Sequence, residues 1–74
     1  MGYIVISKDG KPVKAIGPLS TDNAWWFFGF HNYDEDSETP GLYHAGKGHR
    51  PGITGQFYEN LPEGLPVERF QIMM

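Results

Sequence analysis

Five large aromatic side chains stand within six consecutive positions of this 74-residue chain, in the run WWFFGF at residues 25–30. Such a run needs cover, because full burial of one side chain of this size stabilises a protein by about 1.5–3 kcal/mol. A chain this short forms at most one domain with a small core. The sequence therefore predicts that either the rest of the chain or a second molecule covers part of the run.

Two secondary structures compete for the aromatic run. Ser20 or Thr21 can cap a helix, and Asp22 would then lie near the positive end of the helix dipole. Against a helix, aromatic residues favour strands and Gly29 is a poor helix former. Periodicity does not separate the two, since the run is apolar on all sides. The cap signal favours a helix over residues 21–33, and a strand is the alternative.

An N-terminal β-hairpin is predicted over residues 3–16. Its turn is Asp9-Gly10, a pair that suits the positive φ required at both central positions of a two-residue turn. A regular hairpin around this turn has one apolar face and one more polar face, as expected for a sheet with one side in water. On the apolar face it pairs Ile6 with Val13 and Ile4 with Ala15.

The remaining segments complete a single predicted domain over residues 1–74. Residues 34–52 are expected to be a long polar loop, acidic at its start and basic at its end. Residues 53–74 are expected to supply the C-terminal strand segment, and Pro12 should place the second hairpin strand at a sheet edge. The predicted fold is α+β: a small antiparallel sheet of three to four strands with one aromatic-rich helix packed on one face.

The composition excludes several classes of function. The chain contains no cysteine, which rules out disulfides, thiolate metal ligands and a cysteine nucleophile and favours a cytoplasmic location. Its net charge of −3 disfavours nucleic acid as a partner. The N-terminal segment lacks a secretion signal and no apolar stretch approaches membrane-spanning length, so no membrane partner is expected.

The segment GLYHAGKGHRPG, residues 41–52, comes within one residue of a phosphate-binding P-loop. A P-loop needs Ser or Thr after its lysine, whereas Gly48 follows Lys47, and no helix opens behind it. Nucleotide hydrolysis is therefore not predicted. A looser anion or nucleotide contact is the alternative function, and a solvated loop balanced by its acidic half is the competing interpretation. The residues of that contact would be His44, Lys47, His49 and Arg50.

No catalytic, metal or cofactor site is predicted. The histidines and acidic residues match no zinc or calcium spacing, and no serine stands in a nucleophile motif. The first hypothesis is therefore a non-enzymatic protein-interaction module that occupies a surface of a larger protein or complex, with a homodimer as another use of that surface. Small phage- and mobile-element-encoded inhibitors often have this composition, which is an analogy only. The predicted contact residues are Trp25, Trp26, Phe28, Phe30 and Tyr43.

Overall fold

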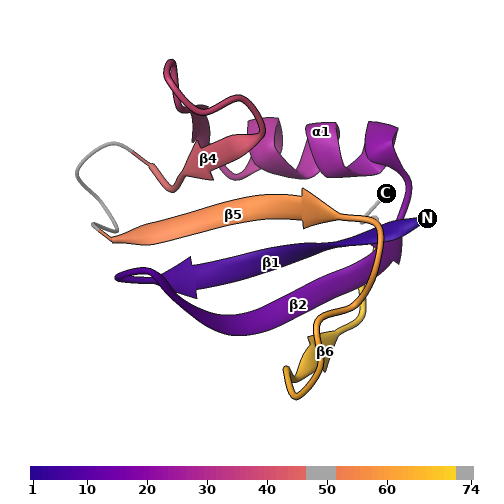
Figure 1. Ribbon diagram of the computed structural model, residues 1–74. Helices are drawn as coiled ribbons and strands as arrows, with labels where there is room; N and C mark the ends of the chain where they lie inside the picture. The colour runs from indigo at the N-terminus through magenta and orange to yellow at the C-terminus, as the bar shows by residue number, and fades with distance from the viewer. Residues whose placement is uncertain (47–51, 72–74) are drawn as a thin grey trace.

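The computed structural model describes residues 1–46 and 52–71. These residues form a helix and a six-stranded sheet with the strand order β3-β4-β5-β1-β2-β6 (Figure 1). The α+β class is confirmed. The expected three to four antiparallel strands are wrong, because the sheet has six strands and β6 pairs parallel with β2. The elements are β1 (Gly2–Lys8), β2 (Lys11–Leu19), α1 (Thr21–Phe30), β3 (Asp34–Glu35), β4 (Leu42–His44), β5 (Ile53–Tyr58) and β6 (Val67–Glu68).

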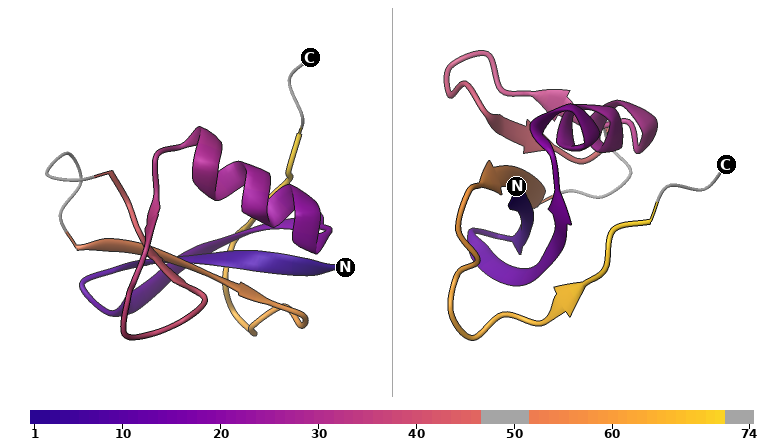
Figure 2. Two further views of the ribbon diagram at one scale, coloured as in Figure 1. Left: turned by 90° about the horizontal axis from the view of Figure 1, so that it is seen from above. Right: turned by 90° about the vertical axis from the view of Figure 1, so that its right-hand side faces the viewer.

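The helix and the sheet form two layers. Figure 2 shows α1 lying across one side of a strongly curled sheet. The segment that joins β5 to β6 runs round the outside of the sheet, away from the helix, before β6 meets β2. β1 lies between β5 and β2. The last strand, β6, pairs with β2.

The N-terminal hairpin closes with the predicted turn. Asp9 and Gly10 have φ values of 51° and 82°, which lie in the left-handed region that a two-residue hairpin turn requires. Lys8 and Lys11 form the pair that flanks the turn. The backbone N–H of Asp9 also donates to the carbonyl of Gly52, at 2.8 Å, so the turn is attached to the start of β5.

A β-bulge in β2 changes the register of this hairpin. One extra residue, Val13, stands between the partners of Ser7 and Ile6 and is half exposed. Beyond the bulge the faces of β2 are exchanged, because side chains alternate along a strand. Ile16 therefore faces the helix and joins the core cluster there, while Ala15, which is also fully buried, lies on the opposite face of the strand. The predicted pairs Ile6–Val13 and Ile4–Ala15 are replaced by Ile6–Lys14 and Ile4–Ile16.

The outer edge of β2 is only partly covered. β6 pairs with Ala15 and Ile16 alone, so the prediction that β2 is an edge strand holds for its first half and is wrong at these two residues. Pro12 lies in that half, where the missing N–H removes a donor that another strand could use. Pro12 and the neighbouring bulge therefore protect the open part of the edge.

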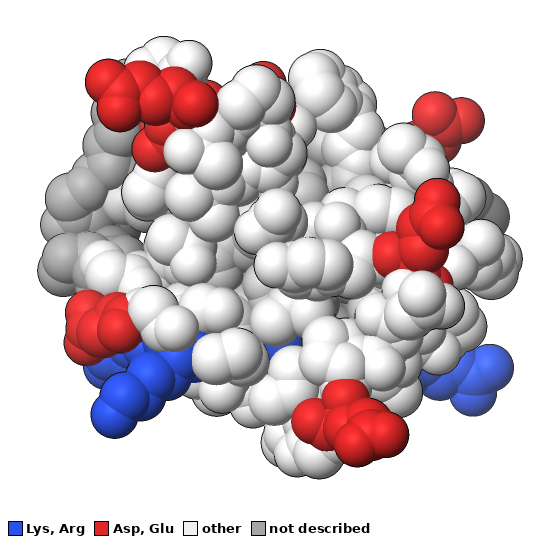
Figure 3. Space-filling view, viewed as in Figure 1, with Lys and Arg blue, Asp and Glu red and all other residues white. Residues whose placement is uncertain are grey.

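The acidic half of the predicted polar loop is a folded hairpin. β3 and β4 pair antiparallel, and the carboxylate of Glu35 accepts from the backbone N–H of Gly41 at 3.0 Å. Figure 3 shows acidic residues over this hairpin, at the upper left, while most of the centre of that face is uncharged. The prediction of a loop over 34–52 is therefore wrong for residues 34–44. The side-chain carboxylates of this segment accept hydrogen bonds from backbone N–H groups that a loop would leave to water.

The C-terminal segment forms less strand than predicted. β6 contains only Val67 and Glu68, attached by a hydrogen bond from the Ala15 N–H to the Pro66 carbonyl at 2.9 Å. Phe70 packs against the core without forming a strand. Residues 72–74 of the predicted C-terminal strand segment lie outside the described residues. No helix in the described parts of the chain is long and apolar enough to cross a membrane.

The aromatic run forms a helix, not the alternative strand. Ser20 is the N-cap, and its hydroxyl accepts a hydrogen bond from the backbone N–H of Asn23 at 3.2 Å. This bond satisfies one of the donors that a helix leaves free at its start. The local cap signal therefore prevails over the β-propensity of the aromatic side chains.

The helix ends at Phe30, three residues earlier than predicted. Asn32 has a φ of 60°, which stops a right-handed helix. Its N–H donates to the carbonyl of Gly29, and the N–H of Tyr33 donates to the carbonyl of Phe28 at 2.8 Å. The rings of Tyr33 and Phe28 also meet, with centroids 5.4 Å apart. These contacts form a Schellman motif, whose glycine position is taken here by asparagine.

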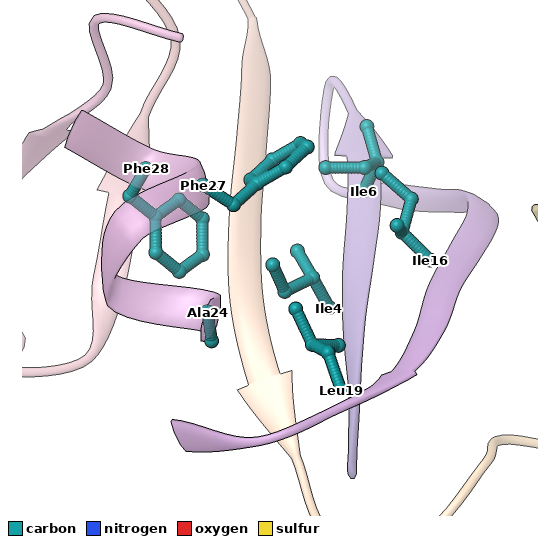
Figure 4. Close-up of a cluster of buried hydrophobic side chains, with 7 residues drawn as sticks. All are labelled: Ile4, Ile6, Ile16, Leu19, Ala24, Phe27 and Phe28. Atoms are coloured by element: carbon teal, nitrogen blue, oxygen red, sulfur yellow. The ribbon is translucent and has the colours of Figure 1, made fainter. Parts of the chain in front are cut away.

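The hydrophobic core lies between α1 and the facing side of β1 and β2 (Figure 4). Strand and helix residues interdigitate there, and Ile4 and Leu19 are fully buried. Tyr33, Tyr43 and Phe57 pack against its margin. The buried cluster consists of Ile4, Ile6, Ile16, Leu19, Ala24, Phe27 and Phe28.

Candidate functional site

The outer side of α1 carries an exposed aromatic surface. The helix turns Ala24, Phe27 and Phe28 into the core, so the residues between them in sequence face outward at 100° per residue. Trp25 is 70% exposed, Phe30 64% and Trp26 41%. This surface, called the α1 aromatic face below, consists of Trp25, Trp26, Gly29 and Phe30.

One half of the α1 aromatic face is held in a fixed arrangement. Trp26 and Phe30 lie one turn apart and stack, with ring centroids 4.8 Å apart and planes inclined by 12°. Phe70 meets Trp26 edge-on at 6.4 Å, so the chain after β6 supports the stack. Stacked and edge-on ring pairs add about 0.5–1.5 kcal/mol beyond burial of area. Both rings are therefore ordered before any partner arrives.

A hollow lies on each side of the α1 aromatic face. Trp25 borders one of about 380 Å³, whose other walls include Pro40 and Tyr43 of the β3–β4 hairpin. Trp26 and Phe30 border another of about 280 Å³, closed by Phe70 and neighbouring residues after β6. Both are open to solvent and can receive side chains from another molecule.

Phe28 and Tyr43, which were predicted to contact a partner, lie inside this arrangement. Phe28 is only 3% exposed, and its ring stacks on that of Tyr43 at 3.9 Å with an inclination of 7°. Burial raises the pKa of the Tyr43 hydroxyl, and the nearby carboxylate of Glu35 raises it further. Phe28 therefore leaves the set of candidate contact residues, and Tyr43 attaches the β3–β4 hairpin to the helix. The position of Ala24, one turn before Phe28, is the sequence signal for this inward face.

His44 lies in the acidic hairpin and is already bonded. Its Nε2 is 2.8 Å from Oδ2 of Asp36, while Oδ1 of Asp36 accepts the N–H groups of Glu38 and Thr39 at 2.8 and 2.9 Å. One carboxylate thus joins the loop of the hairpin to strand β4. The other predicted anion contacts, Lys47, His49 and Arg50, lie outside the described residues.

The Asp36 carboxylate gives the hairpin a pH dependence with a defined sign. The His44 hydrogen bond, followed by the N–H groups of Glu38 and Thr39, lowers the pKa of Asp36 below its ordinary value. A lowered folded-state pKa contributes stability that is present above the unfolded pKa, about 3.9, and lost as the pH falls through the folded pKa. We expect the hairpin to loosen below about pH 4, measured as faster amide hydrogen exchange at Glu38 and Thr39.

Asp36→Asn is the matched variant for this pH prediction. Asparagine keeps an oxygen for the two backbone donors but has no carboxylate to titrate. The loss of amide protection below about pH 4 should then be much smaller than in the parent chain. If both chains lose protection in parallel, Asp36 is not the titrating group.

The described residues contain no group of three or more His, Cys, Asp or Glu side chains that could hold a metal ion. Comparison with known proteins found no match to the chain among protein-family models, curated proteins or solved structures. The α1 aromatic face, its two hollows and the acidic hairpin beside it are therefore the features from which a function is inferred.

Proposed function

We propose that this chain is a non-enzymatic protein-binding module whose α1 aromatic face docks onto a larger protein or protein complex. The observation that carries the proposal is the exposure of Trp25, Trp26 and Phe30 side by side, although the same helix buries Ala24, Phe27 and Phe28 well. Contiguous exposed apolar surface of this kind is characteristic of interaction sites in small proteins.

The residue types in the α1 aromatic face suit a binding hot spot. Tryptophan is among the residues that most often contribute more than about 2 kcal/mol to an interface. The Trp26–Phe30 stack is ordered by Phe70, so little side-chain entropy is lost when a partner binds. The two hollows flanking the stack and Trp25 would receive apolar side chains of the partner.

The acidic hairpin supplies a charge preference next to these aromatics. It forms one wall of the hollow beside Trp25, through Pro40, Gly41 and Tyr43. Asp34, Glu35 and Glu38 are all exposed on it. The expected partner surface is therefore an apolar patch bordered by lysine or arginine, because complementary charge speeds association and excludes wrong partners. An inhibitor that acts by occupying such a surface, of the kind that phages and mobile elements encode, fits this description.

The alternative of anion or nucleotide binding is the weaker proposal. It depends on His44 together with Lys47, His49 and Arg50. His44 is bonded to Asp36 within an acidic hairpin, so its immediate surroundings favour cations over anions.

Trp25→Ala is the variant that tests the proposed function. Trp25 is mostly exposed, so its removal should change the free energy of unfolding by less than about 1 kcal/mol. As a hot-spot residue its loss should weaken partner binding at least tenfold, about 1.4 kcal/mol or more. Two measurements compare the parent and the variant. Thermal unfolding gives their stability, and immobilised chains show which proteins each retains from cell extract.

Tyr58→Ala is the matched control for Trp25→Ala. Tyr58 is also exposed, but it follows Phe57, which packs on the core, so its side chain points to the other face of the sheet. Proteins retained by the parent and by Tyr58→Ala but lost with Trp25→Ala support the proposal. It fails if Trp25→Ala unfolds, or if the variant retains the same proteins as the parent.

A further inference from the structure

We propose that a hollow beyond the C-terminal end of α1 binds a small amphipathic carboxylate of the fatty-acid type, with its apolar chain on the sheet and its carboxylate at Lys8. The hollow measures about 380 Å³, which lies within the range of small-molecule pockets, about 300–1,000 Å³. Trp25, Trp26 and Phe30 do not border it. The site is therefore separate from the α1 aromatic face and from the protein partner proposed for that face.

The hollow exists because α1 is shorter than the strands beneath it. The ten residues of the helix span roughly 15 Å, whereas the nine residues of β2 span roughly 30 Å. In Figure 1, β1 and β2 continue past the end of α1 toward the turn that joins them. The helix therefore covers the half of the sheet near Ile4 and Leu19 and does not reach the half nearer the turn.

Strand alternation places both apolar and cationic side chains on this second half. Ile4 and Ile6 belong to the core cluster under the helix, so Lys8, two residues further along β1, lies on the same face. Lys8 pairs with Ile53 of β5, and Ile6 pairs with Lys14 of β2. Paired residues point to one face of an antiparallel sheet. The floor of the hollow is thus apolar at Ile6 and Ile53, with an ammonium group at Lys8 and another at Lys14.

Aromatic rings at the end of the helix form a wall of the hollow. Phe27 meets His31 at a ring-centroid distance of 4.4 Å and Tyr33 at 5.9 Å. Figure 4 shows the ring of Phe27 directed toward Ile6 and Ile16 of the sheet. Because these rings are already packed against one another, little conformational entropy is lost when a ligand binds. The wall and the floor are mainly apolar, which suits a hydrocarbon chain.

The charges at the hollow favour a ligand with one negative charge. Its charged lining residues are Lys8, Lys14 and Glu68. Glu68 accepts a hydrogen bond from Nζ of Lys14 at 2.8 Å, so these two charges compensate each other. Lys8 forms no ion pair with a carboxylate in the described parts of the chain. A single carboxylate would pair with Lys8, whereas a phosphate group with two charges would need further donors.

The test is a titration of the full chain with octanoate, followed through the backbone amide shifts in NMR spectra. The expected Kd is on the order of 0.1–1 mM, because the hollow is small and open to solvent. The largest shifts should occur at Ile6, His31 and Ile53, which line the hollow. Octanamide has nearly the same shape but no charge, so it should bind at least threefold more weakly.

Lys8→Gln is the variant that tests the position of the carboxylate. It removes the charge and should raise the Kd for octanoate about threefold to tenfold. Lys11→Gln is the matched control, because Lys11 pairs with Lys8 across the turn but does not border the hollow. Its loss should change the Kd by less than about twofold. Both lysines are exposed, so thermal unfolding should be nearly unchanged in both variants. Trp25→Ala should bind octanoate like the parent chain.

Three results would overturn this site. The first is no binding of octanoate at about ten times the expected Kd. The second is equal binding of octanamide, or equal weakening by Lys8→Gln and Lys11→Gln, because the carboxylate would then not be held at Lys8. The third is a set of shifts centred on Trp25, Trp26 and Phe30, which would place the ligand on the α1 aromatic face. The proposed function keeps its own test, since retention of a protein partner by Trp25→Ala is measured without octanoate.

Discussion

Phe28→Ala is expected to lower the free energy of unfolding by about 3–5 kcal/mol, whereas Phe30→Ala, on the same helix, should lower it by only about 1–2 kcal/mol. Phe28 is buried and stacks on Tyr43 at 3.9 Å. It also meets Phe27 and Tyr33 at ring-centroid distances of 5.8 and 5.4 Å. Truncation would therefore open a cavity where the helix, the β3–β4 hairpin and the sheet meet.

The loss expected for Phe28→Ala is large relative to the total free energy of unfolding of a 74-residue chain. Small domains have about 0.05–0.15 kcal/mol of stability per residue, or roughly 4–11 kcal/mol for this length. The free energy of unfolding of both variants is measured in urea, with tryptophan fluorescence and circular dichroism as the two signals. Phe30 is the matched control, because the residue type and the helix are the same and only the burial differs. Equal losses for the two variants would contradict the assignment of Phe28 to the core and Phe30 to the surface.

Gly55→Ala is expected to destabilise the protein by about 1–3 kcal/mol, although alanine usually stabilises a strand relative to glycine. A Cβ at Gly55 would lie 2.8 Å from Cε1 of Phe28 and 3.4 Å from Cδ1 of Ile6. Phe28 cannot move away easily, because Tyr43 is stacked against its ring. The glycine in the middle of β5 thus permits the helix to approach the sheet closely.

Gly29→Ala is the matched control for Gly55→Ala. Open space surrounds a Cβ at Gly29, so alanine there should stabilise the helix by about 0.5–1 kcal/mol. The two substitutions are chemically identical and are expected to have opposite signs in chemical denaturation. A stabilising effect of alanine at position 55 would show that Phe28 has room to move.

The sequence alone predicted those elements whose signals are local. The Asp9-Gly10 turn formed because positive φ at both central residues is a property of that dipeptide context. The Ser20 cap started α1 because its hydroxyl needs only an N–H three residues later. The α+β class followed from these two features. Each depends on a few neighbouring residues, so no knowledge of distant contacts was required.

The tertiary structure decided the features that depend on residues far apart in the chain. The bulge at Val13 moved Ile16 into the core. This register is stabilised by the helix, which packs on that side of the sheet. β6 found its place beside β2 through backbone hydrogen bonds, which carry no sequence signal.

The candidate site likewise has one feature that the sequence determined and one that the tertiary structure decided. The sequence determined that a chain of this size holds more aromatic surface than one small sheet can cover, since that follows from composition and length. Only the tertiary structure decided which rings are left over. Ala24 and Gly55 allow Phe28 to be buried against the sheet and Tyr43, so Trp25, Trp26 and Phe30 remain outside. That outcome depends on helix orientation and on close approach across the sheet, which are properties of packing and not of any one segment.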